Sequence, residues 1–213
     1  MENLQGFYDL LMHFDRYMDV VIPHYGGWTY FILSFIIFAE VGLVVTGILP
    51  GDSLLFAAGA IAARGTLDLA SLLLLLIPAC ALGNISNYMI GSFLGPWLEK
   101  RKNIPFFSHS DIARGHQFFA QNGRWAVILA RFLPVIRTFA PLAAGISNMD
   151  KLPFILYSVA ASAAWVSGYV LAGYFFGNIP FIKQHFMLVV LGIVFVTMLP
   201  TLIKVIARLV RKQ

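Results

Sequence analysis

The sequence predicts an all-α polytopic membrane protein, and three observations lead to this fold class. First, 59% of the 213 residues are hydrophobic and only 12% are charged, whereas a soluble domain carries roughly 25% charged residues. Second, several apolar segments are long enough to cross a hydrocarbon core of about 30 Å. Third, two of these segments contain charges and are interrupted by proline and glycine. We therefore expect about four spanning helices and two oppositely oriented re-entrant hairpins, which together form an inverted repeat.

Residues 1–213 are expected to form a single membrane domain, because no polar stretch is long enough to fold separately. Its predicted parts are an amphipathic N-terminal helix (1–24), a first repeat (25–98), a second repeat (99–180), and a C-terminal spanning helix with a basic tail (181–213). The N-terminal helix has apolar side chains at helical spacing on one face, namely Phe7, Leu10, Leu11, Phe14 and Met18. This helix either lies on the membrane surface or packs against the membrane domain.

The first repeat contains an apolar stretch that is too long for one spanning helix. Residues 28–63 carry only two charges, Glu40 and Asp52. As one helix they would span about 54 Å, against a hydrocarbon core of about 30 Å. Pro50 and Gly51 mark the place where this stretch has to break, because proline lacks a backbone donor and glycine tolerates unusual dihedral angles.

The second repeat contains another interrupted segment, 125–147, which carries Arg131 and Arg137. Both interrupted segments contain an Ala-Ala-Gly run, and paired segments of this kind indicate the central site of a transporter. The residues predicted to break the two hairpins are Pro50, Gly51, Pro134, Pro141 and Gly145. Further spanning helices are predicted over residues 69–94, 152–176 and 186–205.

The basic residues predict the orientation of the chain in the membrane. The 99–124 loop contains five lysines and arginines and the C-terminus contains four, whereas the 63–68 and 177–185 loops contain one each. The positive-inside rule therefore places the 99–124 loop and the C-terminus in the cytoplasm. The two interrupted segments then open toward opposite sides of the membrane.

The two arginines of the second segment are the main indication of function. A guanidinium keeps its charge in a protein, so at membrane depth it needs a partner, water or an anionic ligand. Arg131 and Arg137 are candidate ligands for a lipid phosphate, whose oxygens match the planar fork of guanidinium donors. The alternative is structural, in that Glu40 and Asp52 neutralise the arginines and lock the hairpins together. Both roles are compatible if a phosphate competes with the acids.

Glu40 and Asp52 have two alternative roles. As proton-coupling groups, they release a proton when the arginine is free and take one up when phosphate occupies it. As permanent counter-ions, they keep their charge throughout. Asp52 has a third alternative as the N-cap of the helix that follows it.

Four further polar residues lie inside apolar segments and either line a cavity or form hydrogen bonds between helices. They are Asn84, Asn87, Tyr88 and Thr138. The aromatic residues Trp28, Trp97, Trp165 and Tyr174 are expected to be interfacial anchors or packing residues.

Several ligand classes are not expected. The five histidines lack metal-ligand spacing and Cys80 is the only cysteine, so we expect no metal site, no cofactor and no internal disulfide. The net charge of +5 does not indicate nucleic acid, because the basic residues cluster at segment ends.

Four motifs together resemble the DedA family of bacterial inner-membrane proteins, which share the SNARE-associated or VTT domain. They are Glu40, the Leu-Pro-Gly-Asp-Ser run at 49–53, the Arg131-Phe-x-Pro-x-x-Arg137-Thr-x-x-Pro-x-x-Ala-Gly145 run, and Gly173-Tyr-Phe-x-Gly177. The resemblance covers residues 25–180 and implies two re-entrant hairpins of opposite orientation. It also implies that the functional acids and arginines are Glu40, Asp52, Arg131 and Arg137. One departure is Asn84, where many members have Asp, so a proton relay here has to rest on Glu40 and Asp52.

The resemblance implies lipid transport. Bacterial members are linked to the recycling of undecaprenyl phosphate, and other relatives to the movement or scrambling of phospholipids. We therefore expect a membrane transporter of undecaprenyl phosphate, with a phospholipid flippase or scramblase as the alternative. An enzyme is not expected, because a lipid-phosphate phosphatase needs a nucleophile or general acid and neither interrupted segment contains a histidine. A scaffold that does not transport is a further alternative, and the sequence does not predict an oligomeric state.

Overall fold

Helices make up nearly all of the chain that the structure describes. The computed structural model describes residues 25–43, 51–99, 125, 136–177, 179, 182, 188–189, 191–193 and 195. The helices are α3 (Gly27–Gly42), α4 (Gly51–Ala62), α5 (Leu69–Glu99), α8 (Ile136–Ile146) and α9 (Lys151–Phe176). No described residue lies in a β-strand, so the all-α class is confirmed for this part of the chain. The predicted N-terminal helix, the 99–124 loop and most of the last span lie outside the described residues.

Two helices are long and apolar enough to cross a membrane, namely Leu69–Gly95 within α5 and the whole of α9. They coincide with the spans predicted over residues 69–94 and 152–176. The apolar helices α3 and α4 are shorter, with 16 and 12 residues.

The long apolar stretch of the first repeat forms two helices, as its length required. Helix α3 ends at Gly42, and Leu43 has an extended backbone with φ of −104° and ψ of 116°. Helix α4 begins at Gly51 and is about 18 Å long at 1.5 Å per residue. The end of α3 precedes the predicted break at Pro50, which lies outside the described residues.

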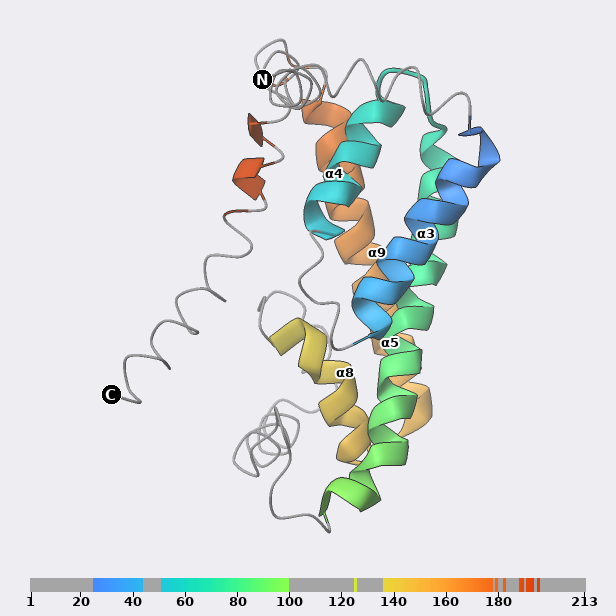
Figure 1. The fold of residues 1–213 in the computed structure, drawn as a ribbon, viewed down its shortest axis with the longest axis vertical. Coiled ribbons are helices and arrows are strands. Elements are labelled where there is room, and N and C mark those ends of the chain that lie inside the picture. Colours follow the sequence, from blue (N-terminus) through green and yellow to red (C-terminus); the bar gives the residue numbers. More distant parts are fainter. Residues whose placement is uncertain are drawn as a thin grey trace, which may run out of the picture.

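The short helices α4 and α8 run in opposite directions from the middle of the molecule (Figure 1). The long helices α5 and α9 run antiparallel beside them, along the long axis. Each short helix packs on the long helix of the other half of the chain, since α4 contacts α9 and α8 contacts α5. Helix α3 packs along α5.

Two glycines allow α4 and α9 to approach closely. A Cβ atom at Gly59 of α4 would lie 2.0 Å from the carbonyl oxygen of Val170, and one at Gly173 of α9 would lie 2.0 Å from that of Phe56. These distances are far shorter than any real contact, and the opposing atoms are backbone. Only glycine therefore fits at these two positions.

The contact between α8 and α5 has the same form. A Cβ atom at Gly145 of α8 would lie 2.1 Å from the carbonyl oxygen of Tyr88, and one at Gly91 of α5 would lie 2.2 Å from that of Leu142. The spacing also matches, because Phe56 and Gly59 correspond to Leu142 and Gly145, and Tyr88 and Gly91 correspond to Val170 and Gly173. The chain uses one helix contact twice, in opposite directions, which is the arrangement that an inverted repeat produces.

Pro141 and Gly145 do not interrupt their segment as predicted. Helix α8 is continuous from Ile136 to Ile146 and contains both residues. Pro141 cannot donate to the carbonyl of Arg137, four residues earlier. The helix continues because α8 is packed against α5, where Gly145 serves close contact and not a turn.

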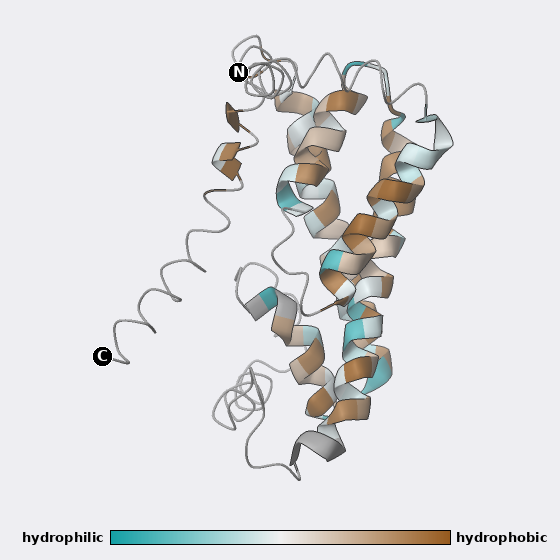
Figure 2. Cartoon of the chain, viewed as in Figure 1, coloured by the Kyte–Doolittle hydropathy of each residue, from teal (hydrophilic) through white to brown (hydrophobic). Residues whose placement is uncertain are grey.

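Apolar side chains fill the interior and also cover the outward faces. Ile37, Leu72 and Val166 are fully buried in one core that joins α3, α5 and α9. On the outside, Leu74 is 73% exposed and Phe93 is 85% exposed. Figure 2 shows hydrophobic colouring along much of α3 and α5. Exposed apolar surface on this scale indicates an apolar environment or a partner.

Asp68 closes the connection between α4 and α5. The backbone N–H of Ser71 donates to Asp68 Oδ2 at 2.7 Å, and the Asp68 N–H donates to the Tyr30 hydroxyl at 2.7 Å. Hydrogen bonds from the Ser71 side chain and backbone hold the pKa of Asp68 below its ordinary value of 3.8. Asp68 is therefore the N-terminal cap of α5.

Asp68→Ala is expected to lower the melting temperature, whereas Asp68→Asn keeps a capping oxygen and is expected to retain most of the stability. Because the folded-state pKa is the lower one, the contribution of the charged cap is complete above pH 3.8 and is lost as the pH falls through the folded-state pKa. Thermal melts in detergent at neutral and acidic pH measure this. Equal melting temperatures for wild type and Asp68→Ala at neutral pH would contradict the capping role.

Candidate functional site

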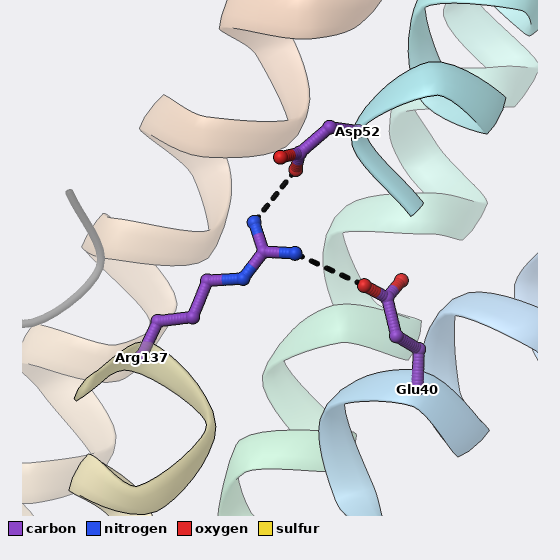
Figure 3. Close-up of polar contacts among 3 residues, drawn as sticks. All are labelled: Glu40, Asp52 and Arg137. Carbon is purple, nitrogen blue, oxygen red and sulfur yellow. Dashed lines mark hydrogen bonds and ion pairs between the residues drawn. The ribbon is translucent and has the colours of Figure 1, made fainter. Parts of the chain in front are cut away.

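Three charged side chains meet where α4 and α8 begin and α3 ends (Figure 3). Arg137 lies in the first turn of α8, Asp52 in the first turn of α4, and Glu40 in the last turn of α3. Arg137 Nη1 donates to Asp52 Oδ1 at 2.7 Å, and Nη2 donates to Glu40 Oε1 at 3.1 Å. One guanidinium therefore links the two halves of the chain.

The three side chains differ in their access from outside. The side chains of Glu40 and Asp52 are 2% and 5% exposed, whereas that of Arg137 is 19% exposed. Asp52 is the second residue of α4 and its carboxylate is directed to Arg137, so its predicted alternative as an N-cap is wrong. The arginine is the approachable member of the cluster.

Gly51 makes room for the Glu40 carboxylate. A Cβ atom at Gly51 would lie 1.7 Å from Glu40 Oε2 and 2.5 Å from the carboxyl carbon. Among the described residues, positive φ angles occur at Gly26, Gly65 and Asn148. The need for glycine at position 51 therefore arises from space, whereas the sequence predicted that it would arise from unusual dihedral angles.

The starts of two helices add to the electrostatics of the site. Helices α4 and α8 have 12 and 11 residues, and both begin at the charged cluster. The positive ends of their dipoles favour a negative group there. Asp52 satisfies this preference, whereas the positive Arg137 lies against it. The negative charges of the two carboxylates are thus balanced by one arginine and by the positive ends of two helix dipoles.

Trp165 of α9 is a contact of Arg137 that the sequence did not indicate. The guanidinium carbon lies 5.1 Å from the centre of the Trp165 ring, and Trp165 is only 8% exposed. Its ring meets that of Tyr169 edge to face at 5.7 Å, and Tyr169 is itself a neighbour of Asp52. Trp165 is therefore a buried packing residue and not an interfacial anchor, and its ring packs against the Arg137 guanidinium. A tryptophan in an apolar helix carries no sequence signal that reveals such a contact.

The two buried asparagines form hydrogen bonds between helices. Asn84 Nδ2 of α5 donates to Ser162 Oγ of α9 at 3.2 Å. Asn87 Nδ2 donates to the carbonyl oxygen of Val41 in α3 at 3.2 Å. Of the two predicted alternatives, lining a cavity or bonding between helices, these contacts correspond to the second. Asn84 thus joins the two long helices.

Tyr88 also joins two parts of the chain. Its hydroxyl donates to the carbonyl oxygen of Met149, and its ring stacks on Phe154 with centres 4.4 Å apart. Thr138 lies in α8 next to Arg137, but its side chain is outside what the structure describes. Arg131, Pro50 and Pro134 also lie outside the described residues. Within the described part of the chain, no group of three or more His, Cys, Asp or Glu residues is placed to hold a metal.

Several known proteins are similar to this chain over most of its length. Residues 49–175 match the VTT domain. Protein DedA of Escherichia coli (strain K12) is 40% identical over 208 residues, which cover 97% of this chain and 95% of that protein. An uncharacterized membrane protein of Mycobacterium leprae is 43% identical over 168 residues, covering 79% of this chain and 75% of that protein. The inner membrane protein YghB of E. coli is 34% identical over 167 residues, covering 76% of this chain and 74% of that protein.

No solved structure matches the chain. The family predicted from the motifs is thereby confirmed, and the chain belongs to the DedA family of VTT-domain proteins.

Proposed function

We propose that this protein moves undecaprenyl phosphate between the leaflets of the bacterial inner membrane. The phosphate binds to Arg137, together with Arg131, while the polyprenyl tail stays in the surrounding lipid. The observation that carries this proposal is the difference in access, because Arg137 is 19% exposed while both of its carboxylate partners are closed off. A ligand that reaches the cluster meets a cation, and a guanidinium binds phosphate oxygens through its planar fork of donors.

A membrane is the environment that the apolar surface supports. Two helices are long enough to span it, and large side chains such as Leu74 and Phe93 face outward. The E. coli relatives YghB and YqjA are named inner membrane proteins. We place this chain in the same membrane as a multi-pass protein, with the C-terminus in the cytoplasm as the basic residues predict.

Binding of a phosphate has a consequence for the two acids. Arg137 already donates to Asp52 and Glu40, so an incoming phosphate competes with them for the same donors. A buried carboxylate that loses its cation favours the neutral form, because burial disfavours the charge. Phosphate binding is then accompanied by proton uptake, which is the basis of the proposed proton coupling through Glu40 and Asp52.

Reconstituted vesicles test the proposed transport. The protein is placed in liposomes that contain labelled undecaprenyl phosphate or labelled phosphatidylethanolamine, with and without a pH gradient. We expect faster movement of undecaprenyl phosphate, a dependence on the gradient, and loss of movement in Arg137→Ala. Equal movement of both lipids without a gradient indicates a phospholipid scramblase instead. Release of phosphate from undecaprenyl pyrophosphate indicates a phosphatase, and a correctly inserted Arg137→Ala protein with full function in cells indicates a scaffold.

Gly51→Ala is expected to reduce both transport and stability. The new methyl group meets the Glu40 carboxylate, which is the end of a flexible side chain and can move away from Arg137. We expect a loss of stability of about 1–3 kcal/mol, typical of overpacking, and at least a tenfold loss of transport, on the order of one lost charged hydrogen bond.

Gly27→Ala is the matched control, because nothing lies within 4 Å of a Cβ atom at Gly27. Both variants are compared with wild type by thermal melting and by the vesicle assay. Wild-type transport in Gly51→Ala would show that the position of Glu40 is unimportant.

A further inference from the structure

We propose that Trp165 is a positioning residue that holds the Arg137 guanidinium in place while a phosphate replaces its carboxylate partners. This inference rests on the proposed function, since it concerns how the same site exchanges one anion for another. It assigns a role to a residue of α9 that carries no charge and that the family motifs quoted above do not include.

Trp165 contacts Arg137 in addition to the two acids. Glu40 and Asp52 engage the Nη2 and Nη1 atoms of the guanidinium, whereas the indole packs at 5.1 Å from its central carbon. A cation over an aromatic ring is attracted by the ring's π face, and this attraction increases where water is scarce. Trp165 is 8% exposed, so the contact is largely desolvated.

The chemistry of the three partners is different. The two carboxylates occupy N–H donors and therefore compete with an incoming phosphate. The indole binds through its π face and occupies no N–H donor, so it does not compete. It also has no proton to gain in the physiological range. Unlike the two carboxylates, Trp165 can therefore keep its contact with Arg137 when a phosphate arrives.

Tyr169, on the same helix, helps to fix the position of the indole. Trp165 meets Tyr169 edge to face at 5.7 Å, a favoured geometry for an aromatic pair. Both residues belong to α9, which is fixed to α4 by the contact between Gly173 and Phe56. Arg137 belongs to α8, which packs on α5. The indole therefore holds the guanidinium in place relative to α9. Helix α9 in turn packs on α4, which carries Asp52.

Substitution of Trp165 tests this role through lipid binding in detergent. Trp165→Leu is expected to weaken undecaprenyl phosphate binding by about 5- to 30-fold, the range of a desolvated cation–π contact. Trp165→Phe keeps a π face and is expected to recover much of the affinity. Phe154→Leu is the matched control, since Phe154 is a buried aromatic of the same helix whose stacking partner is the neutral Tyr88. It is expected to keep wild-type affinity.

Fluorescence gives a second readout that leaves Trp165 itself in place. With Trp28, Trp97 and Trp125 replaced by phenylalanine, Trp165 is the remaining tryptophan. Its emission is expected to change when undecaprenyl phosphate is added and to stay unchanged with undecaprenol, which lacks the phosphate.

The inference is overturned if Trp165→Leu binds undecaprenyl phosphate as tightly as wild type while Arg137→Lys binds it more weakly. It is also overturned if Trp165→Leu and Trp165→Phe are equally impaired, because packing volume alone then explains the loss. If Arg137→Lys binds like wild type, the proposed function itself fails, and this outcome is separate from the first two.

Discussion

Arg137→Ala is expected to abolish transport and to destabilise the protein by about 3–5 kcal/mol, the cost of removing one partner from a buried ion pair. The substitution leaves Glu40 and Asp52, which are 2% and 5% exposed, without the guanidinium that they share. Transport in vesicles and thermal melting in detergent measure the two effects. Arg137→Lys is expected to be intermediate in stability and still poor in transport, because an ammonium lacks the planar fork.

A charge-free variant separates the structural role of the cluster from its role in binding. Glu40→Gln, Asp52→Asn and Arg137→Gln combined, here called the triple variant, remove all three charges, and the first two substitutions keep the size of the side chain. The triple variant leaves no uncompensated buried charge, which is the main cost of removing one partner, so we expect it to recover much of the stability lost in Arg137→Ala. It is not expected to recover transport. A triple variant with wild-type transport would mean that the cluster only holds the helices together.

Gly173→Ala is expected to disrupt the contact between α4 and α9. The added methyl group would lie 2.0 Å from the carbonyl oxygen of Phe56 and 3.0 Å from the N–H nitrogen of Ala60. Both atoms are backbone, so a helix has to shift and no side chain can rotate away. We expect a loss of at least about 3 kcal/mol, the upper part of the range for overpacking. Because the shift moves Asp52's helix relative to α9, transport is expected to fall as well.

Gly168→Ala is the matched control on the same helix. Nothing lies within 4 Å of a Cβ atom at Gly168, so alanine is expected to stabilise α9 by about 0.5–1 kcal/mol through its higher helix propensity. Gly145→Ala is expected to resemble Gly173→Ala, since it blocks the equivalent contact between α8 and α5. Equal melting temperatures for Gly173→Ala and Gly168→Ala would contradict the close helix contact described here.

The sequence predicted the elements better than their partners. The length of the apolar stretch 28–63 required a break, and the structure divides it into α3 and α4. Long apolar runs predicted helices over 69–94 and 152–176, and the structure has α5 and α9 there. No local pattern shows that α4 packs on α9 and not on α5, because that choice depends on contacts between distant segments. Pro141 was interpreted as a break for a similar reason, since the packing that stabilises α8 around it is tertiary.

The charged part of the site was predictable and the aromatic part was not. Arg137, Glu40 and Asp52 were identified because unpaired charges are costly in apolar segments, and the structure brings these three together. The role of Gly51 was predicted for the wrong reason, because a sequence does not show which side chain approaches a glycine. Trp165 was not identified as a contact of Arg137, since an aromatic residue in an apolar helix has many ordinary explanations.

The most direct test of the account is a binding measurement of undecaprenyl phosphate and undecaprenol on wild type and on the triple variant. The two lipids differ only in the phosphate, so their ratio of affinities reports the contribution of the headgroup site. Wild type is expected to prefer undecaprenyl phosphate by at least about 100-fold, on the order of two charge-assisted hydrogen bonds. In the triple variant, this ratio of affinities is expected to fall by at least about tenfold. An unchanged preference in the triple variant would contradict the assignment of Arg137 as the phosphate ligand.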